Sequence, residues 1–269
     1  MTIEKFQIIS TAGQRLSARL DLPADGAPVA YALLAHCFTC SKDVKALYHI
    51  ARALTRQRIG VLRFDFTGLG ESGGDFADTS LTTNVQDLVA AAESLAARFE
   101  APKLLVGHSF GGAAVITAAA AMDSCKAVAV IAAPADPRHV ARTLGSGAEA
   151  IAAHGEASVK IAGRTFTLRK RFLDDLRGLD PEDLLANLNR ALLVMHSPRD
   201  EVVGIENASR IFQAARHPKS FVSLDSADHL LSDPADARYA GSVIAAWAMR
   251  YIAPPANAEA PEARPARET

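Results

Sequence analysis

Hydrophobic and polar positions alternate at the start of the chain and then give way to longer apolar runs. Residues 15–22 (Arg-Leu-Ser-Ala-Arg-Leu-Asp-Leu) alternate cleanly, which predicts a half-exposed strand, and residues 3–10 predict its antiparallel partner. Residues 29–36 and 60–66 are nearly continuous apolar runs, as is typical of strands covered on both faces. The pattern therefore predicts an antiparallel strand pair that leads into a buried sheet.

Segments with helical spacing of apolar residues alternate with further apolar strands along the rest of the chain. Strands are predicted at 103–106, 127–132, 191–195 and 220–224, and helices at 44–54, 81–99, 112–122, 205–215 and 236–251. This alternation predicts an α/β fold with a mostly parallel central sheet and helices on both faces. In such sheets, ligands bind beyond the carboxyl ends of the strands.

The alternation of strands and helices breaks between residues 134 and 190. A small hairpin is predicted there from 157–161 and 164–168, flanked by helical pieces that include 181–188. We interpret 134–190 as a small cap-like insertion in one domain that spans residues 1–253. Residues 254–269 are rich in Pro and Ala and have little apolar bulk, which predicts a disordered tail or linker.

Composition narrows the class of protein. A net charge of −1 gives no electrostatic argument for binding nucleic acid or an anionic membrane. The N-terminus does not have the pattern of a signal peptide, and no apolar run approaches the roughly twenty residues that span a bilayer. Three cysteines do not make a disulfide framework, so a cytoplasmic protein is expected.

A short apolar run leads into Gly107-His108-Ser109-Phe110-Gly111, the Gly-x-Ser-x-Gly pattern of a nucleophile elbow. The serine stands at a sharp turn from strand to helix, and its glycine neighbours leave room for the helix to pack on the strand. We predict Ser109 as a catalytic nucleophile, with a glycine-rich surface turn as the alternative.

A serine nucleophile needs a base, and the base needs an acid to orient it. His229 follows the last predicted strand in a loop, and Asp200 follows the strand before it. The order Ser109, Asp200, His229 is that of one hydrolase fold. Asp225 and Asp228 are rivals for the acid because they are close to His229 in sequence, with Glu201 as the fallback.

Other residues near the predicted strand ends are candidates for lining the substrate pocket. These candidates are His36, Cys37 and His108; His196 also adjoins a strand end, although such histidines more often serve packing. The remaining histidines are predicted to lie on the surface: His49, His139, His154 and His217. An oxyanion hole needs two backbone donors, of which the N–H of Phe110 is the first, and the second is expected from the loop at 36–40.

These motifs together resemble the α/β-hydrolase superfamily, especially its small serine esterases and aminopeptidase-like members. The resemblance includes the segment Asp65-Phe66-Thr67-Gly68-Leu69-Gly70-Glu71-Ser72 and extends over most of residues 25–252. More narrowly, His-Cys-Phe-Thr-Cys followed by Ser-Lys-Asp at 41–43 is similar to bacterial hydrolases that are often fused upstream of a redox-active OsmC-type domain. The resemblance implies Phe38 as the second oxyanion donor, and an insertion that lies over the acyl pocket as in feruloyl esterase relatives.

The chain departs from the resemblance at Cys37 and Cys40, where many relatives have glycine. A Cys-x-x-Cys beside His36 raises a redox or metal-binding alternative, but a structural zinc site needs four ligands, and two inert thiols are the favoured interpretation. A second alternative is phosphate binding by the glycines of 68–74, which we interpret as a turn because no Lys-Ser/Thr follows.

The leading hypothesis is a carboxylesterase that hydrolyses small acyl esters without a cofactor or a metal. A thioesterase and an aminopeptidase-like amidase are alternatives with the same residues. A hypothesis from another class is an accessory or binding module for an OsmC-type redox partner. No nucleic-acid or membrane partner is expected, and the sequence does not determine the oligomeric state.

Overall fold

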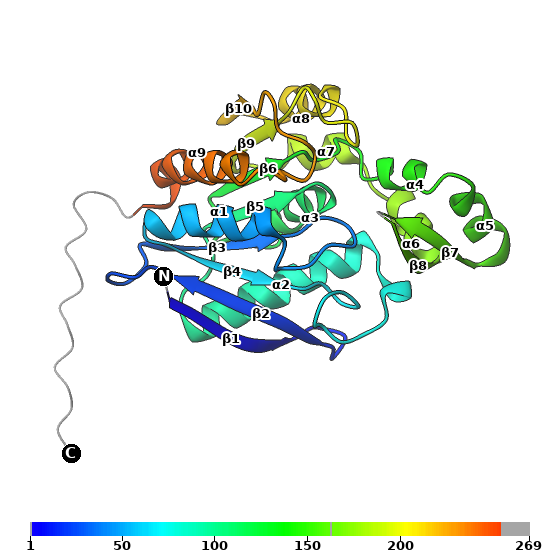
Figure 1. The fold of residues 1–269 in the computed structure, drawn as a ribbon, viewed down its shortest axis with the longest axis horizontal. Helices are drawn as coiled ribbons and strands as arrows, with labels where there is room; N and C mark the ends of the chain where they lie inside the picture. Colours follow the sequence, from blue (N-terminus) through cyan, green and yellow to red (C-terminus); the bar gives the residue numbers. More distant parts are fainter. Residues whose placement is uncertain (1, 162, 254–269) are drawn as a thin grey trace, which may run out of the picture.

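The computed structural model describes residues 2–161 and 163–253 (Figure 1). Its centre is an eight-stranded sheet in the order β1-β2-β4-β3-β5-β6-β9-β10. The strands are β1 (Thr2–Ile9), β2 (Arg15–Leu22), β3 (Ala30–Ala35), β4 (Ile59–Phe64), β5 (Leu104–His108), β6 (Ala127–Ile131), β9 (Ala191–His196) and β10 (Lys219–Ser223). β2 is antiparallel to β1 and β4, and the other neighbours are parallel, which confirms the predicted fold class. The predicted tail at 254–269 lies outside the described residues.

The alternation at the start of the chain sets the register of the antiparallel strands. Leu16, Ala18 and Leu20 of β2 are buried. Leu16 pairs with Ile8 of β1, Ala18 pairs with Phe6 of β1 and Phe64 of β4, and Leu20 pairs with Leu62 of β4. All six residues of β3 are buried, as expected for a strand that is covered on both faces.

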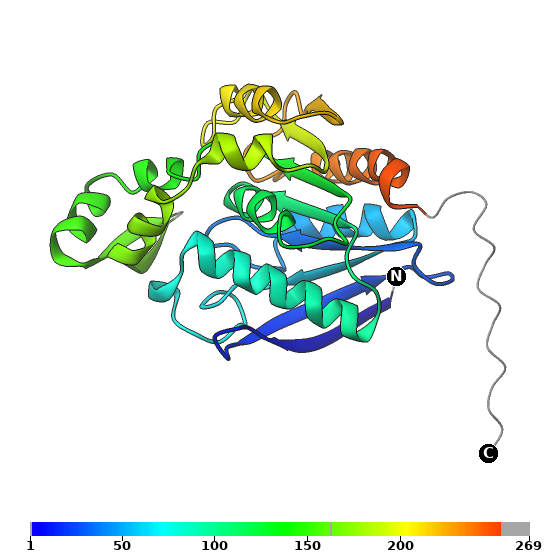
Figure 2. The same ribbon diagram turned by 180° about the vertical axis from the view of Figure 1, so that it is seen from behind.

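Helices cover both faces of the sheet, as predicted. α1 (Lys45–Arg56) and α9 (Pro234–Ile252) pack together on one face, where they share a hydrophobic core with β3, β5 and β6 (Figure 1). α2 (Leu81–Arg98), α3 (Phe110–Ala119) and α8 (Glu206–Ala214) contribute to a second core on the opposite face (Figure 2).

The helix predicted at 112–122 in fact begins at Phe110 and ends at Ala119. It begins earlier because β5 passes into it through a single residue, Ser109, with no connecting loop. The other core strands and helices lie within two residues of their predicted bounds.

Most of residues 134–190 form a separate group of short elements at one end of the sheet, beyond the carboxyl ends of the parallel strands, whereas the last of these elements, α7, packs against α8 and α3 on the main body (Figure 1). Its elements are α4 (His139–Thr143), α5 (Ser146–His154), β7 (Glu156–Ile161), β8 (Arg164–Arg169), α6 (Lys170–Arg177) and α7 (Pro181–Ala186). β7 and β8 form an antiparallel hairpin, in agreement with the predicted one. The short helices α4 and α5 have too few turns to show a clear apolar periodicity. The division into a domain and a cap-like insertion stays an interpretation.

A buried ion pair joins the antiparallel strands β2 and β4, and its arginine also contacts the loop after β3. Arg63 Nε lies 2.7 Å from Asp21 Oδ2, and both side chains are 0% exposed. A second guanidinium nitrogen of Arg63 donates to the carbonyl oxygen of Lys42, 2.6 Å away. Loss of either charge would leave its partner buried without compensation, which is far more costly than loss of a surface pair.

We expect Asp21→Ala to lower the free energy of unfolding by about 3 kcal/mol, because Arg63 would then be a buried cation whose remaining carboxylate contact is the partly exposed Asp43, 4.0 Å away. Chemical denaturation followed by circular dichroism measures this change. Asp174→Ala is the matched control, since Asp174 pairs with Lys170 and Arg177 on the surface, and its effect should be much smaller. Equal effects of the two substitutions would contradict the importance of the buried pair.

Candidate active site

Ser109 stands at the turn between β5 and α3 in a strained backbone conformation. Its φ of 54° and ψ of −123° lie in a region that residues other than glycine rarely adopt. A Cβ at Gly111 would lie 2.3 Å from the carbonyl oxygen of His36, and one at Gly107 would lie 2.4 Å from the carbonyl oxygen of Gly111. Glycine is therefore required on both sides of the serine, because the backbones approach too closely for any side chain.

Three side chains that are far apart in the sequence form a continuous hydrogen-bonded chain at this turn. His229 Nε2 lies 3.0 Å from Ser109 Oγ, and His229 Nδ1 lies 2.8 Å from Asp200 Oδ2. Because an ionised carboxylate can only accept, Nδ1 carries the proton, and in the neutral ring Nε2 is free to accept from the serine hydroxyl. The imidazole is 10% exposed, whereas the Asp200 carboxylate is fully buried.

Asp200 is held as a carboxylate by the loop that follows β9. Its Oδ1 accepts from the N–H groups of Val202 and Val203, at 2.9 and 2.8 Å, while His196 Nε2 lies 3.5 Å from Oδ2. Burial by itself would raise the pKa of Asp200, but the hydrogen bonds from His196, His229 and Val203 outweigh it and hold the pKa below its usual range. Asp200 therefore stays charged and can stabilise an imidazolium.

The three rival acids do not contact His229. Asp228 Oδ1 instead accepts from the N–H of Ser232, at 2.8 Å, and stabilises the turn that carries the histidine. Asp225 and Glu201 are exposed. The carboxylate that contacts His229 thus comes from the end of β9, the strand next to β10, although two other aspartates are closer in sequence.

His36 and His108 were predicted to line the pocket, and this prediction is wrong because both rings are buried behind it. His108 Nε2 donates to the carbonyl oxygen of His229, 2.7 Å away, and so anchors the loop that carries the imidazole. His36 Nδ1 donates to the carbonyl oxygen of Cys37 at 2.8 Å, and its Nε2 accepts from the N–H of Phe66 at 3.3 Å. The two histidines therefore fix backbone positions around the site.

Burial keeps both of these rings neutral. It lowers the pKa of His108 to about 4, with a further contribution from the nearby His229. It also lowers the pKa of His36. Neither ring has a place for a second proton, because His36 Nε2 accepts from the N–H of Phe66 and the buried Nδ1 of His108 has no hydrogen-bond partner among the described residues.

A cavity of about 470 Å³ opens above Ser109 and His229. Its walls come from the loop after β3, from α4, from the β7–β8 hairpin and from the loops after β9 and β10: Cys37, Phe38, Thr39, Cys40, Phe110, Pro134, His139, Val140, Thr143, Lys160, Ile161, Arg164, Val202, Val203 and Leu230. Cys37 lines this cavity as predicted. The residues from the insertion were not predicted, because no sequence pattern indicates which side of a hairpin or a short helix faces a distant serine.

His139 was predicted to be a surface residue, but it is half-buried and lines the cavity. Its Nε2 donates to the carbonyl oxygen of Val202 at 3.0 Å, so it connects α4 to the loop that bears Asp200. His49 is also half-buried, whereas His154 and His217 are exposed as predicted.

The loop after β3 lies directly beside the turn at Ser109. The rings of Phe38 and Phe110 are 5.2 Å apart between centroids. Phe110 is the first residue of α3, so its N–H has no partner within the helix. The N–H of Phe38 makes no hydrogen bond to any residue that the structure describes.

Cys37 and Cys40 were predicted to be free thiols, and this prediction is wrong: they form a disulfide. A turn closed by the N–H of Cys40 and the carbonyl oxygen of Cys37, at 3.1 Å, brings their Cα atoms to 5.3 Å, within the usual range for such bonds. Thr39, inside this turn, has a φ of 65°. The spacing of the two cysteines in the sequence did not reveal this turn. The disulfide closes the turn that contains Phe38.

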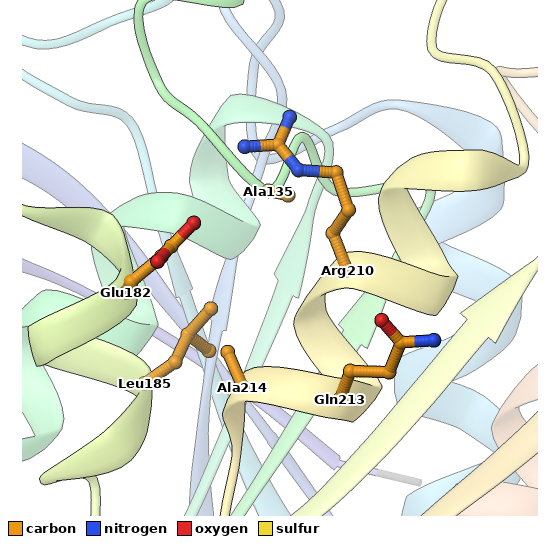
Figure 3. A pocket seen from close by; sticks show the side chains of 6 residues that line it. All are labelled: Ala135, Glu182, Leu185, Arg210, Gln213 and Ala214. Atoms are coloured by element: carbon orange, nitrogen blue, oxygen red, sulfur yellow. The ribbon is translucent and has the colours of Figure 1, made fainter.

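A second hollow, of about 290 Å³, lies between α7 and α8, away from the three side chains (Figure 3). Glu182 of α7 and Arg210 of α8 extend from the two helices that flank it (Figure 3). The hollow contains no nucleophile and no histidine. We assign no chemistry to it.

The chain belongs to the α/β hydrolase family. The model of this family matches residues 32–251. The esterase domain of a Rhodothermus marinus protein is 50% identical, with a TM-score of 0.78 over 94% of this chain and 100% of that one. No curated protein matches the chain.

More distant structures share the fold. Est1E from Butyrivibrio proteoclasticus with bound ferulic acid is 22% identical, with a TM-score of 0.78 over 91% of this chain and 98% of that one. Mouse alpha/beta hydrolase domain-containing protein 10 is 17% identical, with a TM-score of 0.75 over 92% and 99% of the two chains. The family and the esterase neighbours support an enzyme of the hydrolase class. Among residues 2–161 and 163–253, no helix is both long and apolar enough to cross a membrane.

The neutral state of His108 makes stability depend on pH. Its pKa is about 4 in the folded protein and about 6.5 when unfolded, so the unfolded chain binds the extra proton between these values and stability falls as the pH falls. His108→Gln keeps a donor for the His229 carbonyl but does not titrate. Between pH 7.5 and pH 5, we expect wild type to lose about 2 kcal/mol more unfolding free energy than this variant. Denaturant unfolding at the two pH values measures the difference, and parallel losses would show that His108 does not titrate in this range.

Proposed function

We propose that the protein is a serine hydrolase that cleaves small carboxylic esters. The observation that carries the proposal is the chain of hydrogen bonds from Ser109 through His229 to Asp200, at 3.0 and 2.8 Å, at the floor of a cavity. A serine hydroxyl is a weak nucleophile by itself, and a base in hydrogen-bonding contact is what activates it.

In this mechanism, His229 Nε2 removes the proton of Ser109 as Oγ attacks the ester carbonyl carbon. The imidazolium that forms is stabilised by the Asp200 carboxylate, and it then protonates the leaving alcohol. Water enters next, gives a proton to His229 and attacks the acyl-enzyme. The acid is released, and the serine regains its proton.

The negative charge on the carbonyl oxygen needs donors that are already in place. The N–H groups of Phe110 and Phe38 suit this role, since the first stands at a helix start and the second makes no hydrogen bond within the described part of the chain. The disulfide between Cys37 and Cys40 restricts the turn that presents the Phe38 N–H. Such restriction favours catalysis, because donors that are held in position need no reorganisation during the reaction.

Esters are favoured over thioesters and amides by the relative that is 50% identical, which is described as an esterase domain. The cavity is also consistent with an acyl group, because Phe38, Phe110, Val140 and Val203 give it an apolar lining near the serine.

Ser109→Ala should reduce hydrolysis of chromogenic esters by about 10³-fold or more, because no other group in the cavity can form the acyl-enzyme. Steady-state kinetics and covalent labelling by a fluorophosphonate test this together. Wild type should be labelled and the variant should not. Full activity in the variant would refute the proposed nucleophile.

Asp200→Asn should lower kcat by about 10³-fold, because an amide N–H facing His229 Nδ1 would favour the tautomer that cannot accept from Ser109. Asp225→Asn serves as the matched control: this rival acid is exposed and close in sequence, yet its replacement should change kcat by less than about twofold. The reverse result would assign the acid to Asp225.

A further inference from the structure

The cavity above Ser109 combines apolar walls with a cationic edge. Among its lining residues are Lys160 and Arg164 of the β7–β8 hairpin, and none is an aspartate or a glutamate. Other lysine and arginine side chains of this region, in contrast, form ion pairs with carboxylates. The register of the hairpin pairs Lys160 with Thr165 and Ile161 with Arg164, so the side chains of Lys160 and Arg164 leave the hairpin on opposite faces. Arg164 shares its face with Ile161, and Lys160 adds positive charge from the other face of the same hairpin end.

Neither of these cations is within salt-bridge distance of a carboxylate among residues 2–161 and 163–253. Their neighbours on β8 and α6 behave differently. Arg169 pairs with Asp78 and Glu156, and Arg177 pairs with Asp174. Among the cations of β7, β8 and α6, the unpaired ones are thus the two that line the cavity, whereas the others have carboxylate partners: Arg169, Lys170, Arg171 and Arg177.

Arg164 is held over the cavity by contacts on both sides. One of its guanidinium nitrogens donates to the carbonyl oxygen of Thr39, 3.3 Å away in the loop after β3. Its guanidinium carbon lies 4.9 Å from the centroid of the Phe166 ring. These contacts use only part of the five N–H donors of arginine, so donors remain for an anionic ligand.

The position of His229 indicates which half of an ester occupies this cavity. A separate hollow of about 460 Å³ also borders His229 and includes Arg199, Glu201 and Asp228, but not Ser109. Because His229 must deliver its proton to the leaving oxygen, the alcohol is expected on that side. The acyl group then lies in the cavity that contains Ser109, Phe38 and Phe110.

We propose that Arg164, with added positive charge from Lys160, determines acyl specificity by binding a carboxylate at the far end of the acyl chain, so that the preferred substrates are monoesters of dicarboxylic acids. The inference rests on the proposed esterase function. The apolar walls bind the methylene chain, the guanidinium of Arg164 binds the terminal carboxylate, and Lys160 adds positive charge nearby. Arginine and lysine together are well suited to this, because the guanidinium can form paired hydrogen bonds while the ammonium adds charge.

The test compares two esters with the same leaving group and the same chain length, mono-4-nitrophenyl suberate and 4-nitrophenyl octanoate. Wild type should have the higher kcat/KM for the suberate monoester. In the double variant Lys160→Gln/Arg164→Gln, the suberate-to-octanoate ratio should fall about tenfold, mainly through KM. Added salt should lower the ratio in wild type but not in the double variant, because screening weakens only the charged contact.

Two further variants separate charge from general damage. Lys160→Arg/Arg164→Lys keeps both charges and should retain most of the wild-type ratio. Arg177→Gln removes a cation of the same segment that lies outside the cavity, and it should leave the ratio unchanged.

The outcomes distinguish this inference from the proposed function. If both esters are hydrolysed through Ser109 but the ratio is the same in wild type and the double variant, the specificity inference is overturned and the esterase function stands. If Ser109→Ala hydrolyses either ester as fast as wild type, the proposed function fails and the inference fails with it.

Discussion

The close contact between two backbones is the constraint on which the site depends. Gly111, at the start of α3, approaches the carbonyl oxygen of His36 so closely that a Cβ would lie 2.3 Å from it. This contact brings the turn at Ser109 against the loop after β3, which carries Phe38. Any larger residue would separate the two segments, and with them the serine and one of the two proposed oxyanion donors.

Buried polar residues hold these segments in position from behind. His36 and His108 act as neutral donors to backbone carbonyl oxygens, one of them in the His229 loop. In the loop after β3, the N–H and the ammonium group of Lys42 both donate to Asp65, which follows β4. The segment at 65–72 that resembles the family motif is thus structural: the carboxylate of Asp65 occupies the space above Gly70, so it leaves no room there for a phosphate.

The insertion adds a wall to the site that the central sheet does not provide. The fold supplies the strand ends and loops that carry the nucleophile, base and acid, whereas α4 and the β7–β8 hairpin supply much of the cavity's lining. Substrate preference can therefore change in the insertion without any change in the hydrogen-bonded chain below it. The accessory role with an OsmC-type partner and the cytoplasmic location stay predictions.

Local pattern determined much of this protein by itself. Periodicity specified nearly all the core strands and helices, because burial on one face or both imposes a repeat of two or of about 3.6 residues. Gly-x-Ser-x-Gly located the sharp turn at Ser109, since only glycine tolerates the backbone contacts there. The order of strands also favoured Asp200, although Asp225 and Asp228 are closer to His229 in sequence.

Only the tertiary structure decided which buried groups face one another. His36 and His108 adjoin strand ends, as pocket residues would, yet their rings turn inward because carbonyl oxygens behind the site need donors. The disulfide between Cys37 and Cys40 depends on a turn with Thr39 in a left-handed conformation, which the spacing does not encode. Lys160 and Arg164 reach the cavity only because the hairpin lies over the sheet end. Contacts between segments so distant in the chain leave no periodic trace in the sequence, and for that reason the fold was predictable while the walls of the site were not.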